Sequence, residues 1–201
     1  MSELITYVQL GFRHIVDVEA MDHILFLLAL AAIYRLRDAR GALAVITAFT
    51  VGHSITLALA VTHVVRLPSA LIEFLIPVTI VATGIENLAA TAERRRARRS
   101  WYRPLIAGVF GLIHGAGFAN YLNALFVDRI ALPLFGFNVG IEIGQVLVLA
   151  SAAVLLATLD TALSAVRSWS ETWTAYRMRV TAVSLAVVVI AARWAVERAP
   201  W

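Results

Sequence analysis

The sequence predicts an all-α polytopic membrane protein, built as a bundle of six transmembrane helices. Three observations lead to this fold class. Hydrophobic residues make up 61% of the 201 residues, and the mean hydropathy of +0.82 is too high for a soluble domain of this length. Several apolar runs approach or exceed the roughly 20 residues that a helix needs to cross a bilayer. The 17 basic residues, all arginine, gather between these runs, as expected near lipid headgroups.

We expect a single transmembrane domain over residues 1–201. Its spans are predicted at about 16–35, 41–64, 69–90, 104–126, 132–158 and 178–197. Pro104 and Pro133 stand at the beginning of the fourth and fifth spans, and proline is tolerated in the first turn of a helix. The segment 160–177 separates the last two spans. Because Trp169, Trp173 and Tyr176 share one helical face, this segment is predicted to contain a short interfacial helix.

The distribution of arginine predicts the orientation of the chain in the membrane. Twelve arginines lie between spans one and two, three and four, and five and six, whereas five lie on the other side. The excess of positive charge on cytoplasmic loops then places both termini on the non-cytoplasmic side. The lipid bilayer is thus an expected partner. The net charge of +4 is explained by these loops and indicates no nucleic acid.

The first span carries an unusual number of ionisable residues. Its uninterrupted apolar stretch, 24–34, is too short to cross a bilayer, so the span must include part of HIVDVEAMDH, which brings His14, Asp22 and His23 to the membrane. Such residues face a bundle interior or a water-filled cavity when they lie in a membrane. The alternative is a hydrated helix start, in which acidic residues such as Asp17 and Glu19 favour the helix N-terminus.

The second and third spans add further polar residues. In the second span Thr50 and Ser54 lie on one narrow stripe with His53 at its edge, which indicates the wall of a polar site. The alternative is that His53 only forms a hydrogen bond between helices. In the third span Glu73 lies near the outer end and Glu86 near the inner end. Glu86 is either an inner gate or an anchor beside the arginine cluster.

The fifth span is marked on two opposite faces. Gly136, Gly140 and Gly144 form one face, and small residues allow another helix to approach closely. The opposite face carries Asn138, Glu142 and Gln145. A carboxylate at the depth of Glu142 is costly unless it is paired, protonated or bound to a cation.

The fourth span places a histidine among glycines in the string FGLIHGAGFA. We expect these glycines to pack against the glycine face of the fifth span, with the second span completing a site around His114. The alternative is that His114 only bonds to a neighbouring helix.

Together these residues predict a cation site inside the bundle. The chain has no cysteine, so the ligands would be nitrogen and oxygen, which suit nickel, cobalt or zinc. The candidate ligands are His14, Asp22, His23, His53, His114 and Glu142. The supporting polar residues are Glu73, Asn138, Gln145, Thr50, Ser54 and Glu86.

Four ordered strings carry a family resemblance: GFRHIVDVEAMDHILFLLAL, TAFTVGHSITL, FGLIHGAGFA and FNVGIEIGQ. In these strings the chain resembles the HupE/UreJ family of bacterial membrane proteins from about residue 11 to 150. The resemblance implies a six-helix permease of the bacterial inner membrane, with nickel as the foremost cargo. It assigns His14, Asp22 and His23 to the family's first motif. Seven residues without a glycine separate His14 from Asp22, a longer gap than the family leads us to expect, so the sequence leaves open whether His14 joins the site.

Three functions remain open at this stage. The first is a permease for a divalent transition-metal cation, most of all nickel, in which Asp22 and His23 capture the ion. The second is an intramembrane metalloenzyme of the zinc hydrolase type, with Glu142 as general base. The third is an accessory membrane subunit that binds haem through a pair of histidines. The sequence also leaves open whether the chain forms a homo-oligomer.

Overall fold

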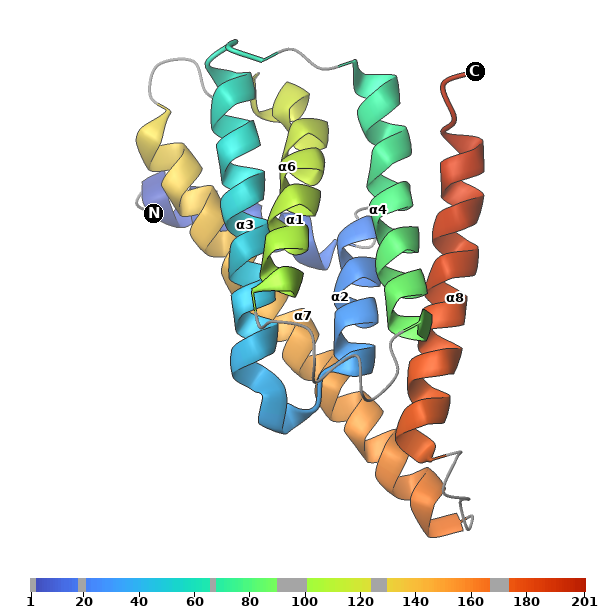
Figure 1. Ribbon diagram of the computed structural model, residues 1–201. Coiled ribbons are helices and arrows are strands. Elements are labelled where there is room, and N and C mark those ends of the chain that lie inside the picture. Colours follow the sequence, from blue (N-terminus) through green and yellow to red (C-terminus); the bar gives the residue numbers. More distant parts are fainter. Residues whose placement is uncertain (1–2, 18–20, 66–67, 90–100, 124–129, 167–173) are drawn as a thin grey trace.

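The chain forms a bundle of helices, as seen in a computed structural model (Figure 1). The structure describes residues 3–17, 21–65, 68–89, 101–123, 130–166 and 174–201. Within these ranges it contains seven α-helices, one short 3-10 helix and no strand. The elements are α1 (Glu3–Val16), α2 (Met21–Ile33), η2 (Leu36–Asp38), α3 (Ala39–Val61), α4 (Ser69–Ala89), α6 (Tyr102–Asn123), α7 (Ala131–Val166) and α8 (Ala175–Glu197). The all-α prediction is confirmed.

Four of these helices are long and apolar enough to cross a membrane. They are α3, α4, α7 and α8, and they correspond to the second, third, fifth and sixth predicted spans. Helix α6 lies at the place of the fourth span and has 22 residues, or about 33 Å at 1.5 Å per residue, but its histidine, glycines and arginine make it less apolar. Helix α7 has 36 residues and crosses the bundle diagonally, continuing past the predicted end of the span at 158 (Figure 1).

The prediction of one continuous helix over 16–35 was wrong. Helix α1 ends at Val16, Asp17 is not helical, and a separate apolar helix, α2, begins at Met21. The two helices meet near the centre of the bundle at a steep angle (Figure 1). With 14 and 13 residues, each extends about 20 Å, less than the roughly 30 Å of a hydrocarbon core.

The glycine faces have different partners from those the sequence suggested. Helix α6 packs against α3, because a Cβ atom on Gly111 would overlap the carbonyl oxygen of Phe49. The glycine face of α7 packs against α1, and a Cβ atom on Gly140 would overlap the carbonyl oxygen of Val8. The expected direct seam between the fourth and fifth spans is therefore replaced by two seams, α3–α6 and α1–α7. The sequence shows which faces are small but not which neighbour each face meets.

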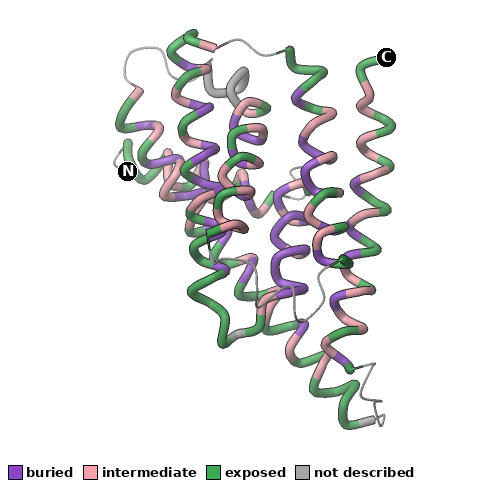
Figure 2. Tube along the Cα trace, viewed as in Figure 1, coloured by how far each residue is buried: buried purple, intermediate pink, exposed green. Residues whose placement is uncertain are grey.

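The two seams place the core in the middle of the bundle. Buried residues are dense along α2 and on one side of α3, whereas the far end of α7 is largely exposed (Figure 2). Helix α8 packs mainly against α4 and begins at Ala175. The side chain of Thr174, just before it, accepts a hydrogen bond from the backbone N–H of Arg177. The predicted interfacial helix over 160–177 falls partly outside the described residues. Its described parts continue α7 and begin α8.

Candidate metal centre

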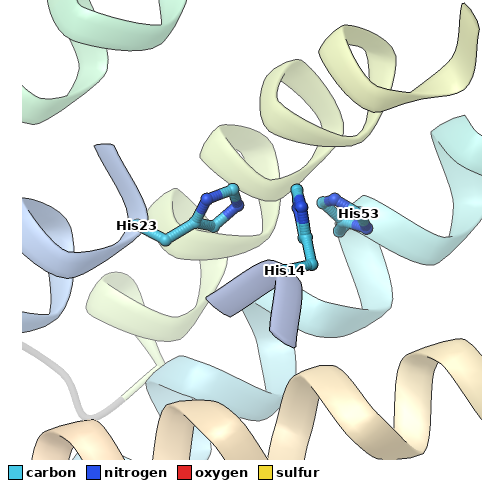
Figure 3. A group of neighbouring side chains, drawn as sticks. All are labelled: His14, His23 and His53. Atoms are coloured by element: carbon cyan, nitrogen blue, oxygen red, sulfur yellow. The ribbon is translucent and has the colours of Figure 1, made fainter. Parts of the chain in front are cut away.

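Three histidines from three helices converge at the centre of the bundle. His14 lies in the last turn of α1, His23 in the first turn of α2, and His53 near the middle of α3. Figure 3 shows their rings turned toward one another. One nitrogen from each ring can be chosen so that all three lie within 4.8 Å of one another. The interruption between α1 and α2 is what makes this possible, because it turns His14 and His23 toward the same point.

The spacing of the rings is close to that of a metal site. The ring centroids of His14 and His23 are 4.7 Å apart, and those of His14 and His53 are 6.1 Å apart. In a tetrahedral site with metal–nitrogen distances near 2.0–2.1 Å, the ligand nitrogens lie about 3.3 Å apart. Side-chain rotations that move the ring nitrogens by about 1 Å would therefore bring them to the spacing of a tetrahedral metal site. Because α1 ends at this cluster, the partial negative charge of its C-terminus also favours a cation there.

Several imidazole nitrogens of this cluster form no hydrogen bond with the described part of the chain. His53 is fully buried, and neither of its ring nitrogens has a hydrogen-bond partner among the described parts of the chain. The same holds, within those parts, for Nε2 of His14 and Nε2 of His23. A buried polar group without a partner costs about 1–3 kcal/mol. A bound cation would satisfy these nitrogens, so the donor set fits a divalent transition metal.

Asp22 orients one of the histidines. Its Oδ1 atom lies 3.1 Å from Nδ1 of His23 and accepts a hydrogen bond from the backbone N–H of His23 at 2.9 Å. The side chain of Asp22 is 18% exposed. A carboxylate beside one nitrogen of an imidazole fixes the ring and leaves the other nitrogen for the metal. The structure thus places Asp22 beside His23, where it can support that candidate ligand.

His114 lies beside the three-histidine cluster, on α6. Its Nδ1 is 2.9 Å from the carbonyl oxygen of Phe110, so this nitrogen carries the proton and donates it. Its Nε2 is therefore left with a lone pair, and within the described ranges no group donates to it. The ring centroid of His114 is 5.5 Å from that of His23. His114 is therefore an immediate neighbour of the cluster.

Two pairs of aromatic rings enclose the histidines. Phe118 and Phe137 stack with their centroids 5.2 Å apart, and the ring of His14 lies 4.0 Å from that of Phe118. Phe26 and Phe49 form a second stack at 4.9 Å, and Phe49 lies 5.0 Å from His114. Apolar rings on both sides exclude water, which strengthens the interaction of the imidazoles with a charge. The sequence analysis did not identify these phenylalanines, because in an apolar sequence they resemble ordinary core residues.

The polar face of α7 meets α3 and not the histidines. The hydroxyl of Thr47 donates to Oε1 of Glu142 at 2.6 Å, and the hydroxyl of Thr50 donates to Oε1 of Gln145 at 2.9 Å. Among the described residues, the carboxylate of Glu142 is not grouped with the three histidines that could hold a metal. The role of Glu142 as a metal ligand therefore stays a prediction.

The remaining supporting residues lie apart from the cluster. Ser54 donates to the carbonyl oxygen of Thr50, and the amide of Asn138 donates to the carbonyl oxygen of Leu134. Glu73 is exposed on α4. Glu86 lies at the other end of α4, with Oε1 3.5 Å from Nη2 of Arg103. None of the hydrogen bonds and ion pairs named here joins these residues to the three histidines.

Apolar helices with a buried cluster of imidazoles define a membrane protein with a candidate metal site. The particular family follows from a comparison with family profiles, in which the profile described as HupE / UreJ protein matches residues 1–198. The chain belongs to the HupE/UreJ family. The resemblance seen in the sequence is thereby confirmed over nearly the whole chain. Searches of curated proteins and of solved structures found no match.

Proposed function

We propose that the chain is a multi-pass permease of the bacterial inner membrane that carries a divalent transition-metal cation, with nickel as its foremost cargo. Cobalt and zinc have the same preference for imidazole and are the alternatives. The observation that carries the proposal is the convergence of His14, His23 and His53 on one buried point. Membership in the HupE/UreJ family, associated with nickel and cobalt uptake, supports the same conclusion.

The ligand set suits transport because it offers a sequence of exchangeable sites. Three neutral imidazoles add no negative charge of their own, so a bound divalent cation keeps its net charge of +2. His114 can take the ion from His23, because the two rings are neighbours. Transport requires binding that is strong enough for entry and weak enough for release. The stacked pairs Phe118–Phe137 and Phe26–Phe49 would close the site on its two sides during this exchange.

The topology of the proposal combines the structure with the sequence. Helices α3, α4, α7 and α8 are long and apolar enough to cross the membrane, and in this proposal α6, with its 22 residues, adds a fifth crossing. The sixth crossing is shared by α1 and α2, which meet at the cluster. Discontinuous helices with a site at the interruption are a recurring arrangement in secondary transporters.

A metalloenzyme is the second candidate, because three histidines with an open position also describe a catalytic zinc site. That reading needs a general base beside the metal. Glu142, the base that the sequence suggested, is instead hydrogen-bonded to Thr47. The geometry therefore supports the permease better than the hydrolase.

The test is metal binding by the purified protein. We expect the unaltered chain to bind about one cobalt(II) or nickel(II) per chain and His23→Asn to bind more than about 100-fold more weakly, because losing a ligand costs more than the roughly 10–100-fold that follows from changing a residue behind a ligand. Uptake of nickel by vesicles containing the protein is expected to fall in parallel. Cobalt(II) absorption reports binding, and radioactive nickel reports uptake.

The matched control is His63, the exposed histidine. His63 is exposed at the end of α3 and has a positive φ of 58°, a conformation that asparagine also adopts readily. His63→Asn should bind metal and take up nickel like the unaltered chain. Equal binding by His23→Asn and His63→Asn would remove the histidine cluster from the proposal.

A further inference from the structure

A second group of polar side chains lies where α2 ends, near the end of α7 and at the beginning of α8. Its members, which we call the arginine–tyrosine cluster, are Arg35, Asp160, Tyr176 and Arg179. These helix ends lie at the same end of the bundle as the end of α4 and the beginning of α6, which stand on either side of the arginine-rich sequence 93–99 (Figure 1). The arginines predict that this end faces the cytoplasm, which puts the cluster near the lipid headgroups of that leaflet.

Arg179 is buried but only partly paired. Its side chain is 7% exposed, and its Nη1 atom lies 2.9 Å from Oδ2 of Asp160. Its Nε and Nη2 atoms, which carry three N–H groups, are buried and donate to no acceptor in the part of the chain that the structure describes. Within the same ranges, Oδ1 of Asp160 is also buried and accepts no hydrogen bond. Buried polar atoms of charged groups are costly to leave unpaired, so a further polar partner would stabilise both side chains.

A second guanidinium lies beside the first. The Cζ atoms of Arg179 and Arg35 are 4.9 Å and 4.2 Å from the centre of the same ring, that of Tyr176, so they are no more than about 9 Å apart. The hydroxyl of Tyr176 donates to the carbonyl oxygen of Ile33 at 2.8 Å, which fixes this ring on the end of α2. The tyrosine thus holds two cationic side chains from different helices around one point.

The unpaired atoms indicate which ligand fits the cluster. Guanidinium N–H groups bind the oxygens of a phosphate in pairs. The free oxygen of the Asp160 carboxylate instead requires a donor, such as a hydroxyl or an ammonium group. A phospholipid headgroup that carries a phosphate together with a hydroxyl or ammonium group offers both. Basic pockets between helices on the cytoplasmic side of a membrane are suited to such headgroups.

The surroundings of the cluster favour a lipid over free phosphate. Leu155 and Leu159, which precede Asp160 on α7, are 60% and 48% exposed, in the part of α7 that is largely exposed in Figure 2. They provide an apolar surface for an acyl chain next to the polar cluster. Because Nε and Nη2 of Arg179 are buried, a headgroup reaches them only when a neighbouring side chain moves. Arg35 is the exposed member of the cluster and is the side chain that can move most readily.

We propose that the arginine–tyrosine cluster binds the headgroup of a glycerophospholipid of the cytoplasmic leaflet. Arg179 and Arg35 hold the phosphate, and Asp160 accepts a hydrogen bond from a hydroxyl or ammonium group of the headgroup. A lipid bound in this way joins α2, α7 and α8 within one leaflet. The inference does not depend on metal transport, because its residues are separate from the three histidines that could hold a metal.

The test measures lipid binding by the purified protein in detergent, with native mass spectrometry. Phosphatidylglycerol, phosphatidylethanolamine and phosphatidylcholine share a phosphate, but the headgroup of phosphatidylcholine has no hydroxyl or ammonium donor. We expect the first two to bind at least about fivefold more tightly than phosphatidylcholine, the gain from one hydrogen bond. Equal binding of phosphatidylethanolamine and phosphatidylcholine, which have the same net charge, would overturn the proposal. Displacement of phosphatidylglycerol by millimolar inorganic phosphate would also overturn it, by assigning the cluster to free phosphate.

A matched pair of variants on α8 locates the site. Arg179→Gln removes the buried guanidinium and should weaken the binding of phosphatidylglycerol at least about fivefold, the loss expected for one arginine at an anionic headgroup. Arg193→Gln makes the same change near the other end of the helix, where Arg193 is exposed and pairs with Glu197, and should leave binding unchanged. Equal binding by the two variants would contradict the site.

Two further variants keep the test independent of a folding defect, which circular dichroism would show. Arg35 is exposed, so Arg35→Gln should fold normally and still weaken the binding of phosphatidylglycerol about fivefold. Arg179→Lys keeps the positive charge but loses the paired N–H groups, so it should restore only part of the binding that Arg179→Gln loses. Binding by Arg35→Gln equal to that of the unaltered chain would overturn the proposal.

Discussion

At the scale of single residues, the cluster is explained by the cost of burying polar groups. Four of the five histidines lie at the centre of an apolar bundle, and the ring of His53 has no exposed surface. Asp22 is the one carboxylate among the candidate ligands that lies against an imidazole of the cluster. Its position indicates that it fixes the ring of His23 and favours the tautomer that leaves Nε2 ready for the metal.

This role predicts a partial effect of Asp22→Asn. An asparagine keeps the size of the side chain and removes the negative charge that orients His23. Metal affinity should fall about 10–100-fold, as is usual when the partner of a ligating histidine is changed. The number of ions bound at saturation should remain the same, which titration calorimetry measures. A loss as complete as that of His23→Asn would show that Asp22 is itself a ligand.

At the scale of elements, two glycine seams position the ligands. The seam of α6 with α3 places Gly111 against the backbone of Phe49 and His53, and the seam of α7 with α1 fixes the helix that carries His14. Small residues drive such packing in membranes because backbones can then approach closely. The interruption between α1 and α2 completes the arrangement, since a straight helix would point His14 and His23 in different directions.

The α3–α6 seam predicts unequal effects of two similar substitutions. A Cβ atom on Gly111 would overlap backbone that cannot move, so Gly111→Ala should lower the free energy of unfolding by about 1–3 kcal/mol or more. The cobalt(II) spectrum should also weaken, because His53 is displaced. On the same helix a Cβ atom on Gly117 would meet the end of the Ile76 side chain at 2.9 Å, which can shift. Gly117→Ala should therefore be nearly neutral.

Thermal unfolding in detergent, followed by circular dichroism, compares the two variants directly. The general preference of helices for alanine over glycine, about 1 kcal/mol, acts equally in both and cancels in the comparison. An unfolding temperature of Gly111→Ala equal to or above that of Gly117→Ala would contradict the close approach of α3 and α6.

At the scale of the whole molecule, the sequence predicted which polar residues form the site better than it predicted how the helices pack around them. It identified all three histidines of the cluster, because a histidine in an apolar run is costly wherever the helix lies. It left the place of His14 open and missed the separate helix α1, because no proline or glycine marks the interruption near Asp17. The partners of the glycine faces also could not be inferred, since a small face fits any small neighbour. Long-range contacts such as Thr47 with Glu142 depend on those partners.

The distribution of arginine gives the last prediction, the orientation of the bundle. Five arginines at 94–99 stand in the sequence between α4 and α6, and the end of α8 lies at the opposite end of the bundle from the end of α4 (Figure 1). Positive loops stay in the cytoplasm, so the C-terminus should be outside it. Alkaline phosphatase, which is active only outside the cytoplasm, should be active when fused after Trp201. A fluorescent protein that matures only in the cytoplasm should be dark there and bright when inserted at 93–99. The opposite pattern would invert the bundle in the membrane.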